Sequence, residues 1–186
     1  MGIRVRAMPH SIIRKFRMLQ FLAKCRGAGV ARPAHFGIAP IVLAGLGGFV
    51  AIGTLAFVSA RFDVVLLLGS FGASCVLLFG YPDAPFAQPA NVIGGHVISA
   101  LIGLALVHSC GVHPWSLGLA VGASIMAMMA TRTVHPPAGS NPVIVFLSQP
   151  GWNFVLFPVL TGALLLVLVA LVYNNAVRKH RYPTYW

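Results

Sequence analysis

The hydrophobic pattern of this chain is interrupted by very few charges. Between Arg32 and Arg178 the charged residues are Arg61, Asp63, Asp83 and Arg132. They separate four uncharged runs, at residues 33–60, 64–82, 84–131 and 133–177. A helix needs roughly 20 apolar residues to cross the hydrocarbon core of a bilayer. The pattern therefore predicts an all-α fold, a polytopic membrane helix bundle.

We expect about six membrane segments. The two longer runs divide at their turn-forming residues, which gives segments at about 37–60, 64–81, 92–110, 114–131, 134–148 and 154–175. The fifth segment is short and contains three prolines. Irregular backbone at membrane depth survives only where protein buries it or where it lines a wet cavity. We therefore expect a broken, buried crossing there; the alternative is five crossings with a re-entrant fifth segment.

Composition supports the membrane assignment and excludes a nucleic-acid partner. Charged residues make up 8% of the chain, against about 25% in soluble domains. The net charge is +11, but eight of the 13 basic residues lie in the first 32 positions and three more lie at 178–181. Basic ends on an apolar body are typical of an integral membrane protein, whose partner is the lipid bilayer.

The placement of the basic residues also predicts orientation, because they favour the cytoplasmic side. Six crossings place 12 basic residues inside and one outside, whereas five crossings place nine inside and four outside. We therefore expect an integral protein of a bacterial inner membrane with both termini cytoplasmic.

Three regions follow from this distribution. Residues 1–33 form a basic N-terminal tail, in which Ile12, Ile13, Phe16, Leu19 and Leu22 recur near helical spacing and predict a helix lying on the inner leaflet. Residues 34–176 form the transmembrane domain, and residues 177–186 form a basic C-terminal tail.

The six segments resemble each other as two triplets, 37–110 and 114–175. The middle segment of each carries small residues followed by an apolar run and a proline, from Gly72 and Ser74 to Pro82 and from Gly139 and Ser140 to Pro150. We expect a 3+3 inverted repeat with short, broken middle helices, an arrangement that places a substrate site near the bilayer midplane. The alternative is that small-residue helices look alike in any tightly packed bundle.

The densest polar stretch is 131–142. It contains Arg132, His135, Gly139, Ser140 and Asn141 around two prolines that suit the first turn of a helix. Free N–H groups and the positive end of a helix favour an anion. The stretch therefore predicts an anion-binding helix start, unless it is a proline kink whose polar groups satisfy each other.

A second polar stretch, 81–96, contains Gln88, Asn91 and His96. The three prolines predict an ordered loop that leads into a helix, which Gln88 and Asn91 are placed to cap. His96 lies on the next turn and is either part of the site or a hydrogen-bonded core residue. Together with Gly72 and Ser74, these residues complete the predicted site.

Other chemistry is poorly supported. The chain has two acidic residues and no cluster of His and Cys with metal-ligand spacing, so we expect no metal, no cofactor, no catalytic residues and no enzyme activity. The many small residues on the predicted spans suggest tight helix packing and a homo-oligomer.

At these two polar stretches the chain resembles the HPP family of integral membrane proteins. The resemblance rests on His135–Pro142, on Gly72–Ser74 with Val76–Phe79, and on Ala87–His96, and it extends over about 36–175. It implies a transporter, since plant plastid members are linked to nitrite transport. Family descriptions often count four spans, fewer than the six expected here. Many members have Arg where this chain has Ala90.

Our leading hypothesis is a transporter or channel for a small, nitrite-like anion. In it, His135 or His96 could also move a proton, because histidine titrates near neutral pH. The alternatives are a transporter of another small solute and a membrane assembly or structural protein that moves nothing.

Overall fold

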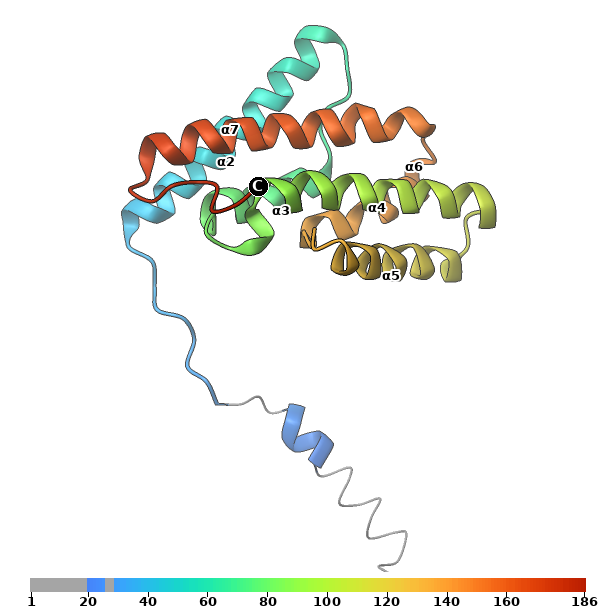
Figure 1. Cartoon of the computed structure of the whole chain (residues 1–186), viewed down its shortest axis with the longest axis horizontal. Coiled ribbons are helices and arrows are strands. Elements are labelled where there is room, and N and C mark those ends of the chain that lie inside the picture. The colour runs from blue at the N-terminus through green and yellow to red at the C-terminus, as the bar shows by residue number, and fades with distance from the viewer. Residues whose placement is uncertain (1–19, 26–28) are drawn as a thin grey trace, which may run out of the picture. The chain divides into compact units, whose positions relative to one another are not determined.

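The computed structural model describes residues 20–25 and 29–186, and residues 37–186 form one compact helical unit (Figure 1). Residues 20–25, in the separate N-terminal unit, are helical. Of the expected interfacial helix, the part that contains Ile12 and Phe16 lies outside the described residues.

Within residues 37–186 the regular structure is entirely helical. Its elements, in chain order, are α2 (Ile38–Phe62), α3 (Gly69–Cys75), η1 (Val76–Gly80), η2 (Pro85–Ala87), α4 (Pro89–Cys110), α5 (Pro114–Ala130), η3 (Pro136–Ser140), α6 (Asn141–Ser148), η4 (Trp152–Val155), η5 (Leu156–Leu160) and α7 (Thr161–Val177). The predicted all-helical polytopic fold is thus confirmed.

Three helical stretches are long and apolar enough to cross a membrane: α2, α4 and the stretch Trp152–Val177 that ends in α7. The shorter apolar helices are α5 and the stretch Gly69–Gly80. The number of crossings and their orientation stay predictions.

The middle segment of each triplet is short and broken. The first consists of α3, seven residues, and η1, five residues, which together rise about 18 Å at 1.5 Å per residue, against a hydrocarbon core of about 30 Å. It begins at Gly69 rather than near residue 64, because Asp63 ends α2 in the left-handed conformation, φ 52°, and residues 64–68 form no helix. Asp tolerates this conformation better than most residues do.

The second middle segment consists of η3, which starts at Pro136 and Pro137, and α6, which ends where Gln149 has φ 45°. A proline in a first turn sacrifices no hydrogen bond, because the N–H groups of that turn have no partner within the helix. The prolines that break this segment therefore also start its helices.

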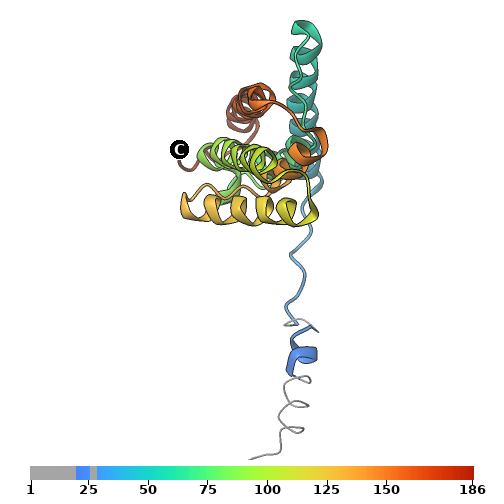
Figure 2. The same cartoon turned by 90° about the vertical axis from the view of Figure 1, so that its right-hand side faces the viewer.

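Helix α4 is the central element of the unit (Figure 2), in contact with α5, α6, α7 and η3. Two of its glycines permit this. A Cβ at Gly95 would lie 2.8 Å from the His135 Cβ and 2.9 Å from the Thr133 carbonyl oxygen, and a Cβ at Gly103 would lie 3.0 Å from the Pro142 Cα. The absence of side chains at these positions lets the second middle segment approach the α4 backbone.

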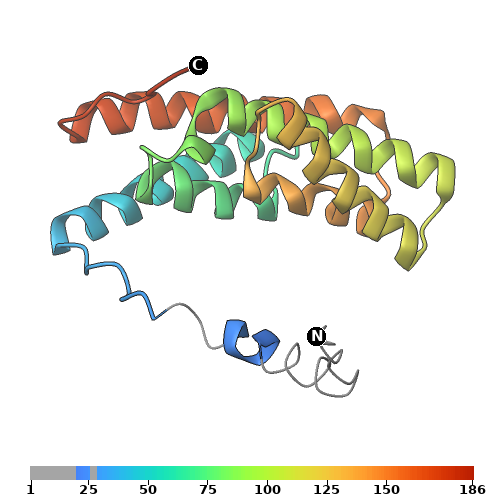
Figure 3. The same cartoon turned by 60° about the horizontal axis from the view of Figure 1, so that its bottom comes forward.

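Helix α7 contacts both α2 and α4 (Figure 3). One apolar core lies among α2, α3, η1 and α7, and a second lies among α4, α6 and the η4–η5 region. The outer face of α2 carries large apolar side chains such as Phe49 and Phe57, which are 76% and 70% exposed. Such a face suits lipid.

Candidate functional site

Four polar side chains from four separate segments meet inside the bundle. They are Ser74 from α3, His96 from α4, His135 from the turn before η3, and Asn141 at the start of α6, and all four are fully buried. We call them the Ser74 cluster. All four belong to the ten residues that the sequence predicted for the site, and the structure brings them together.

Ser74 is the centre of the cluster. Its Oγ lies 2.9 Å from His96 Nε2 and 2.8 Å from His135 Nε2, and the two rings have centroids 5.0 Å apart. The same Oγ lies 3.0 Å from the carbonyl oxygen of Ser70, one turn earlier in α3. One hydroxyl therefore serves both histidines.

The other ring nitrogens also have partners. His96 Nδ1 lies 3.0 Å from Asn141 Nδ2, which also donates to the His96 carbonyl oxygen at 3.0 Å and to Ser99 Oγ at 3.1 Å. His135 Nδ1 lies 2.6 Å from the carbonyl oxygen of Phe86. The Phe71 ring meets the His96 ring edge-on, with centroids 5.1 Å apart. Both imidazoles are thus fixed in orientation.

Two buried polar side-chain atoms have no hydrogen-bond partner among the described residues: Asn141 Oδ1, which belongs to the cluster, and Ser70 Oγ, one turn before Ser74 in α3. Leaving a buried polar atom unpaired costs about 1–3 kcal/mol. Unpartnered atoms in a native structure call for an explanation, and a small bound molecule is one of the standard ones.

Asn91 holds the chain that delivers His135. Its Nδ2 donates to the carbonyl oxygens of Arg132, at 3.3 Å, and Val134, at 3.0 Å. Asn91 therefore fixes both sides of Thr133 in the turn that leads to the site.

Gln88 holds the loop before α4. Its Nε2 donates to the carbonyl oxygens of Pro82 and Ala84, at 2.9 and 3.0 Å, and its Oε1 accepts from the backbone N–H of Thr184. The expectation that this side chain caps α4 is wrong, because Gln88 occupies the N-cap position without a side-chain cap bond. The side-chain amide of Gln88 bonds to the loop carbonyl oxygens instead.

The remaining predicted residues lie away from the cluster. Arg132 is exposed and adopts φ 58°. Gly72 faces outward and lines a shallow hollow between α3 and α2. Ser140 donates to the Pro137 carbonyl oxygen at 2.8 Å, and Gly139 is half-buried.

The C-terminal segment packs against the loop before α4, a contact that no pattern in the sequence predicts. Tyr182 is buried and donates to the Ala87 carbonyl oxygen at 2.7 Å. Burial raises the pKa of its phenol, so the group stays a neutral donor. Arg178 forms a salt bridge with Asp83 at 2.7 Å. The tyrosines of this polar tail do not recur at helical spacing, so their contacts with the loop are seen only in the folded structure.

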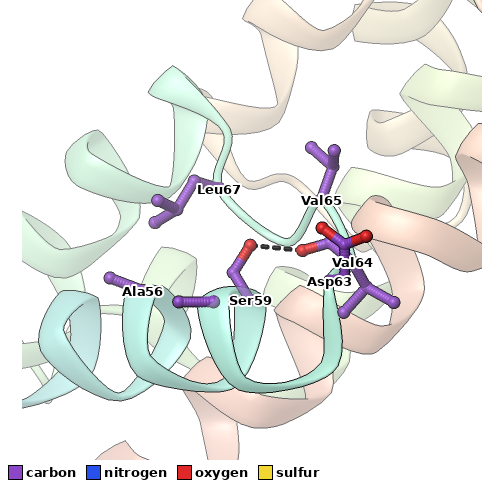
Figure 4. Close-up of a pocket in the computed structure, with 7 residues that line it drawn as sticks. Ala56, Ser59, Asp63, Val64, Val65 and Leu67 are labelled. Carbon is purple, nitrogen blue, oxygen red and sulfur yellow. Dashed lines mark hydrogen bonds between the residues drawn. The ribbon is translucent and has the colours of Figure 1, made fainter.

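Among the described residues, no three or more His, Cys, Asp and Glu side chains form a group that could hold a metal ion. A hollow of about 360 Å³ lies at the end of α2 (Figure 4). Its lining includes Ala56, Leu67 and Asp63, and the Ser59 hydroxyl there donates to the Val64 carbonyl oxygen. It contains none of the predicted site residues.

Apolar helices around a buried polar cluster define a polytopic helical membrane protein. The family model described as HPP, transmembrane region, matches residues 33–183, and the chain belongs to this family. It is 36% identical to one transmembrane protein of Dictyostelium discoideum and 38% identical to another, each over 92% of the chain. The matches span 59% and 65% of those relatives. No solved structure matches.

Proposed function

We propose that this protein moves a small inorganic anion, of the size and charge of nitrite, across a membrane, and that the Ser74 cluster binds it on the way. One observation carries the proposal: four fully buried polar side chains, one of which has an oxygen without a partner among the described residues, lie where two short broken helices approach α4. The proposal assigns transport rather than catalysis.

The cost of polar groups in a membrane supports this role. Ionisable and amide side chains inside an apolar bundle are expensive and in general mark substrate pathways. Broken helices at membrane depth occur where backbone lines a cavity or is buried in protein. Here Ser74 and Asn141 come from two short helices, which supports a substrate site between them.

The hydrogen-bond donors at the site support an anion as the substrate. The Ser70 hydroxyl is buried and has no partner among the described residues, so it can donate to an oxyanion. Arg132 lies three residues before His135 with its side chain exposed, where its charge raises the local concentration of anions. The family resemblance to plastid nitrite transporters agrees with this substrate class.

One observation favours a second solute class. Asn141 Oδ1 is an unpartnered acceptor, and an acceptor requires a donor, which a bare anion lacks. A solute that donates hydrogen bonds, whether neutral or cationic, would satisfy it. Urea and ammonium therefore belong in the same uptake assay as nitrite.

The test is uptake into proteoliposomes that contain the purified full chain. Nitrite is the primary probe, uptake of urea and of ammonium is measured separately, and protein-free vesicles measure leakage through lipid. We expect saturable nitrite uptake that Ser74→Ala reduces at least tenfold. Ser124→Ala is the matched control, because Ser124 is equally buried and its hydroxyl donates only to the Ala120 carbonyl oxygen of its own helix.

Each outcome separates the hypotheses. Uptake of urea or ammonium without nitrite uptake would replace the substrate class and keep the site. Equal loss in Ser74→Ala and Ser124→Ala would remove the site assignment. No flux of any solute by folded protein would favour a structural or assembly role.

A further inference from the structure

The hydrogen-bond geometry fixes where the hydrogens of the Ser74 cluster are. A carbonyl oxygen only accepts, so the 2.6 Å contact between His135 Nδ1 and the Phe86 carbonyl oxygen requires a hydrogen on Nδ1. Neutral imidazole carries one N–H. The Nε2 atom of neutral His135 is therefore an acceptor and must receive the Ser74 hydroxyl hydrogen at 2.8 Å.

The position of that hydrogen determines the state of His96. A serine hydroxyl has one hydrogen, and in this state it is used on His135. His96 Nε2, 2.9 Å from the same oxygen, must therefore donate. Its Nδ1 then accepts from Asn141 Nδ2 at 3.0 Å, and the two amide hydrogens are shared among this nitrogen, the His96 carbonyl oxygen and Ser99 Oγ. Every ring nitrogen in the cluster is satisfied with both histidines neutral.

A second arrangement satisfies the same atoms with one more proton. If His135 Nε2 carries a hydrogen, it donates to Ser74 Oγ, which then accepts from both histidines. The Ser74 hydroxyl turns to the Ser70 carbonyl oxygen, 3.0 Å away. Its two acceptors, His135 Nε2 and the Ser70 carbonyl, thus match the neutral and the protonated state of His135.

His96 has no comparable second state. Its free nitrogen, Nδ1, faces the Asn141 amide nitrogen, and that nitrogen is held by the His96 carbonyl oxygen and by Ser99 Oγ. A hydrogen on Nδ1 would point at another donor. Turning the Asn141 amide over would place its oxygen against the His96 carbonyl oxygen. The same protein surroundings therefore accept a proton at His135 and resist one at His96.

We propose that His135 is the proton carrier of this transporter, taking one proton on Nε2 for each anion that enters the cluster, while His96 stays neutral and positions Ser74. In the step, hydronium from the aqueous side gives its proton to the Nε2 lone pair and leaves as water. The Ser74 O–H bond rotates and does not break. This inference rests on the proposed function and adds its coupling ion.

The groups around His135 explain why a bound anion requires a proton. The titratable side chain that faces His135 is His96 from α4, while α3 contributes Ser74 and α5 brings Met128 close to Gly95 beside it. Tyr182 and Tyr185 of the C-terminal segment reach the carbonyls of Ala87 and Pro85, on either side of Phe86.

None of these groups is a fixed cation. Arg132 is exposed, and Arg178 is paired with Asp83. An anion without a counter-charge is costly in a low-dielectric site, and the proton on His135 supplies that charge. Phe86, whose carbonyl oxygen bonds to His135 Nδ1, and Pro136, which follows His135, are both exposed, so the chain next to the ring reaches the surface of the bundle.

The decisive experiment measures what drives uptake in the proteoliposomes. Nitrite uptake is compared under an inward acid gradient with the membrane potential clamped at zero, and under a membrane potential with equal pH on both sides. Protein-free vesicles are subtracted in each case, because nitrous acid crosses lipid unaided. A dye inside the vesicles reports protons. We expect the pH gradient to drive uptake, the potential to have little effect, and about one proton to enter per nitrite.

Two variants separate the histidines. His135→Gln removes the proton acceptor and should lower the proton-to-nitrite ratio at least fivefold. His96→Gln keeps a donor near Ser74 and should leave the ratio near one, whatever its rate of uptake. Ser124→Ala is the unchanged control. Equal ratios in wild type and His135→Gln would overturn the assignment of His135.

The experiment distinguishes failure of the proton coupling from failure of the proposed function. Potential-driven nitrite uptake without protons would overturn the coupling and keep the proposed function. No nitrite flux by folded wild-type protein would overturn both. Nitrogen NMR of the histidine side chains in detergent checks the geometry without flux: we expect His135 to carry its hydrogen on Nδ1 and His96 on Nε2 at neutral pH. The reverse pattern would overturn the proposal even if transport occurs.

Discussion

Tyr185 Oη donates to Asn91 Oδ1 at 2.8 Å, and the nitrogen of the same amide holds the Arg132 and Val134 carbonyl oxygens. A single side chain therefore connects the C-terminal segment with the turn that carries His135. Through Asn91, the position of the segment near residue 185 is linked to the geometry of the buried site.

Replacing Tyr185 with Phe tests that link. Tyr185→Phe removes the bonds to Asn91 Oδ1 and to the Pro85 carbonyl oxygen, and we expect a loss of about 1 kcal/mol in unfolding free energy. Thermal unfolding in detergent measures it. Trp186→Phe, at a side chain that is 74% exposed, should change nothing measurable. A Tyr185→Phe protein as stable as wild type would show that the segment does not restrain Asn91.

Asn91 should matter more than Tyr185, because its loss leaves two backbone carbonyls without a donor. Asn91→Ala is expected to cost about 1–3 kcal/mol of stability and to reduce uptake through displacement of His135. Asn91→Asp gives a pH test. Beside two carbonyl oxygens only the protonated form of the new carboxyl can donate a hydrogen bond. The variant should then be most stable in acid and lose stability as pH rises. A flat difference from wild type across pH would contradict this account.

Gly95→Ala tests the close approach of His135 to α4. The added Cβ would lie 2.8 Å from the His135 Cβ and 2.9 Å from a backbone oxygen, and such overpacking costs about 1–3 kcal/mol. Gly118→Ala in α5 is the matched control, because a Cβ there meets nothing within 4 Å. It should be neutral or stabilising by up to about 1 kcal/mol. Equal unfolding temperatures for the two variants would mean that the turn before η3 adjusts freely.

Arg132 should act through its charge rather than through a specific contact. Its side chain is exposed, so Arg132→Lys should keep uptake within about twofold of wild type, whereas Arg132→Gln should reduce it severalfold at low ionic strength. Salt should remove most of that difference, because it screens exposed charges. A severe loss in Arg132→Lys at all salt concentrations would instead indicate a planar, bidentate contact with the anion.

The helical fold and the location of the short middle segments could be predicted from the sequence, because apolar runs and prolines are local signals. Ser74, His96, His135 and Asn141 could also be named, since polar residues are rare in such runs. The contact of the Ser74 hydroxyl with both histidines could not be predicted, because the contacting residues are 22 and 61 positions apart in the chain.

The roles of Gln88 and Asn91 show the limit of local reasoning. Both were expected at the solute or as helix caps, and both instead bond to backbone carbonyls of loops. Asp63 gives the same lesson for element boundaries: its left-handed conformation delays the next helix to Gly69. The partners of Gln88 and Asn91 depend on which buried carbonyl oxygens lack a donor in the folded protein, and a sequence pattern does not record that.

The group that orients His135 is a main-chain carbonyl, and this has an evolutionary consequence. Any residue at position 86 presents the same oxygen, and the Phe86 side chain is 42% exposed, so this position is free to drift among relatives while the imidazole keeps its tautomer. A comparison of related sequences would highlight His135 and pass over its partner. Replacing the amide that follows Phe86 with an ester, which weakens the carbonyl as an acceptor, would alter the site without changing any side chain.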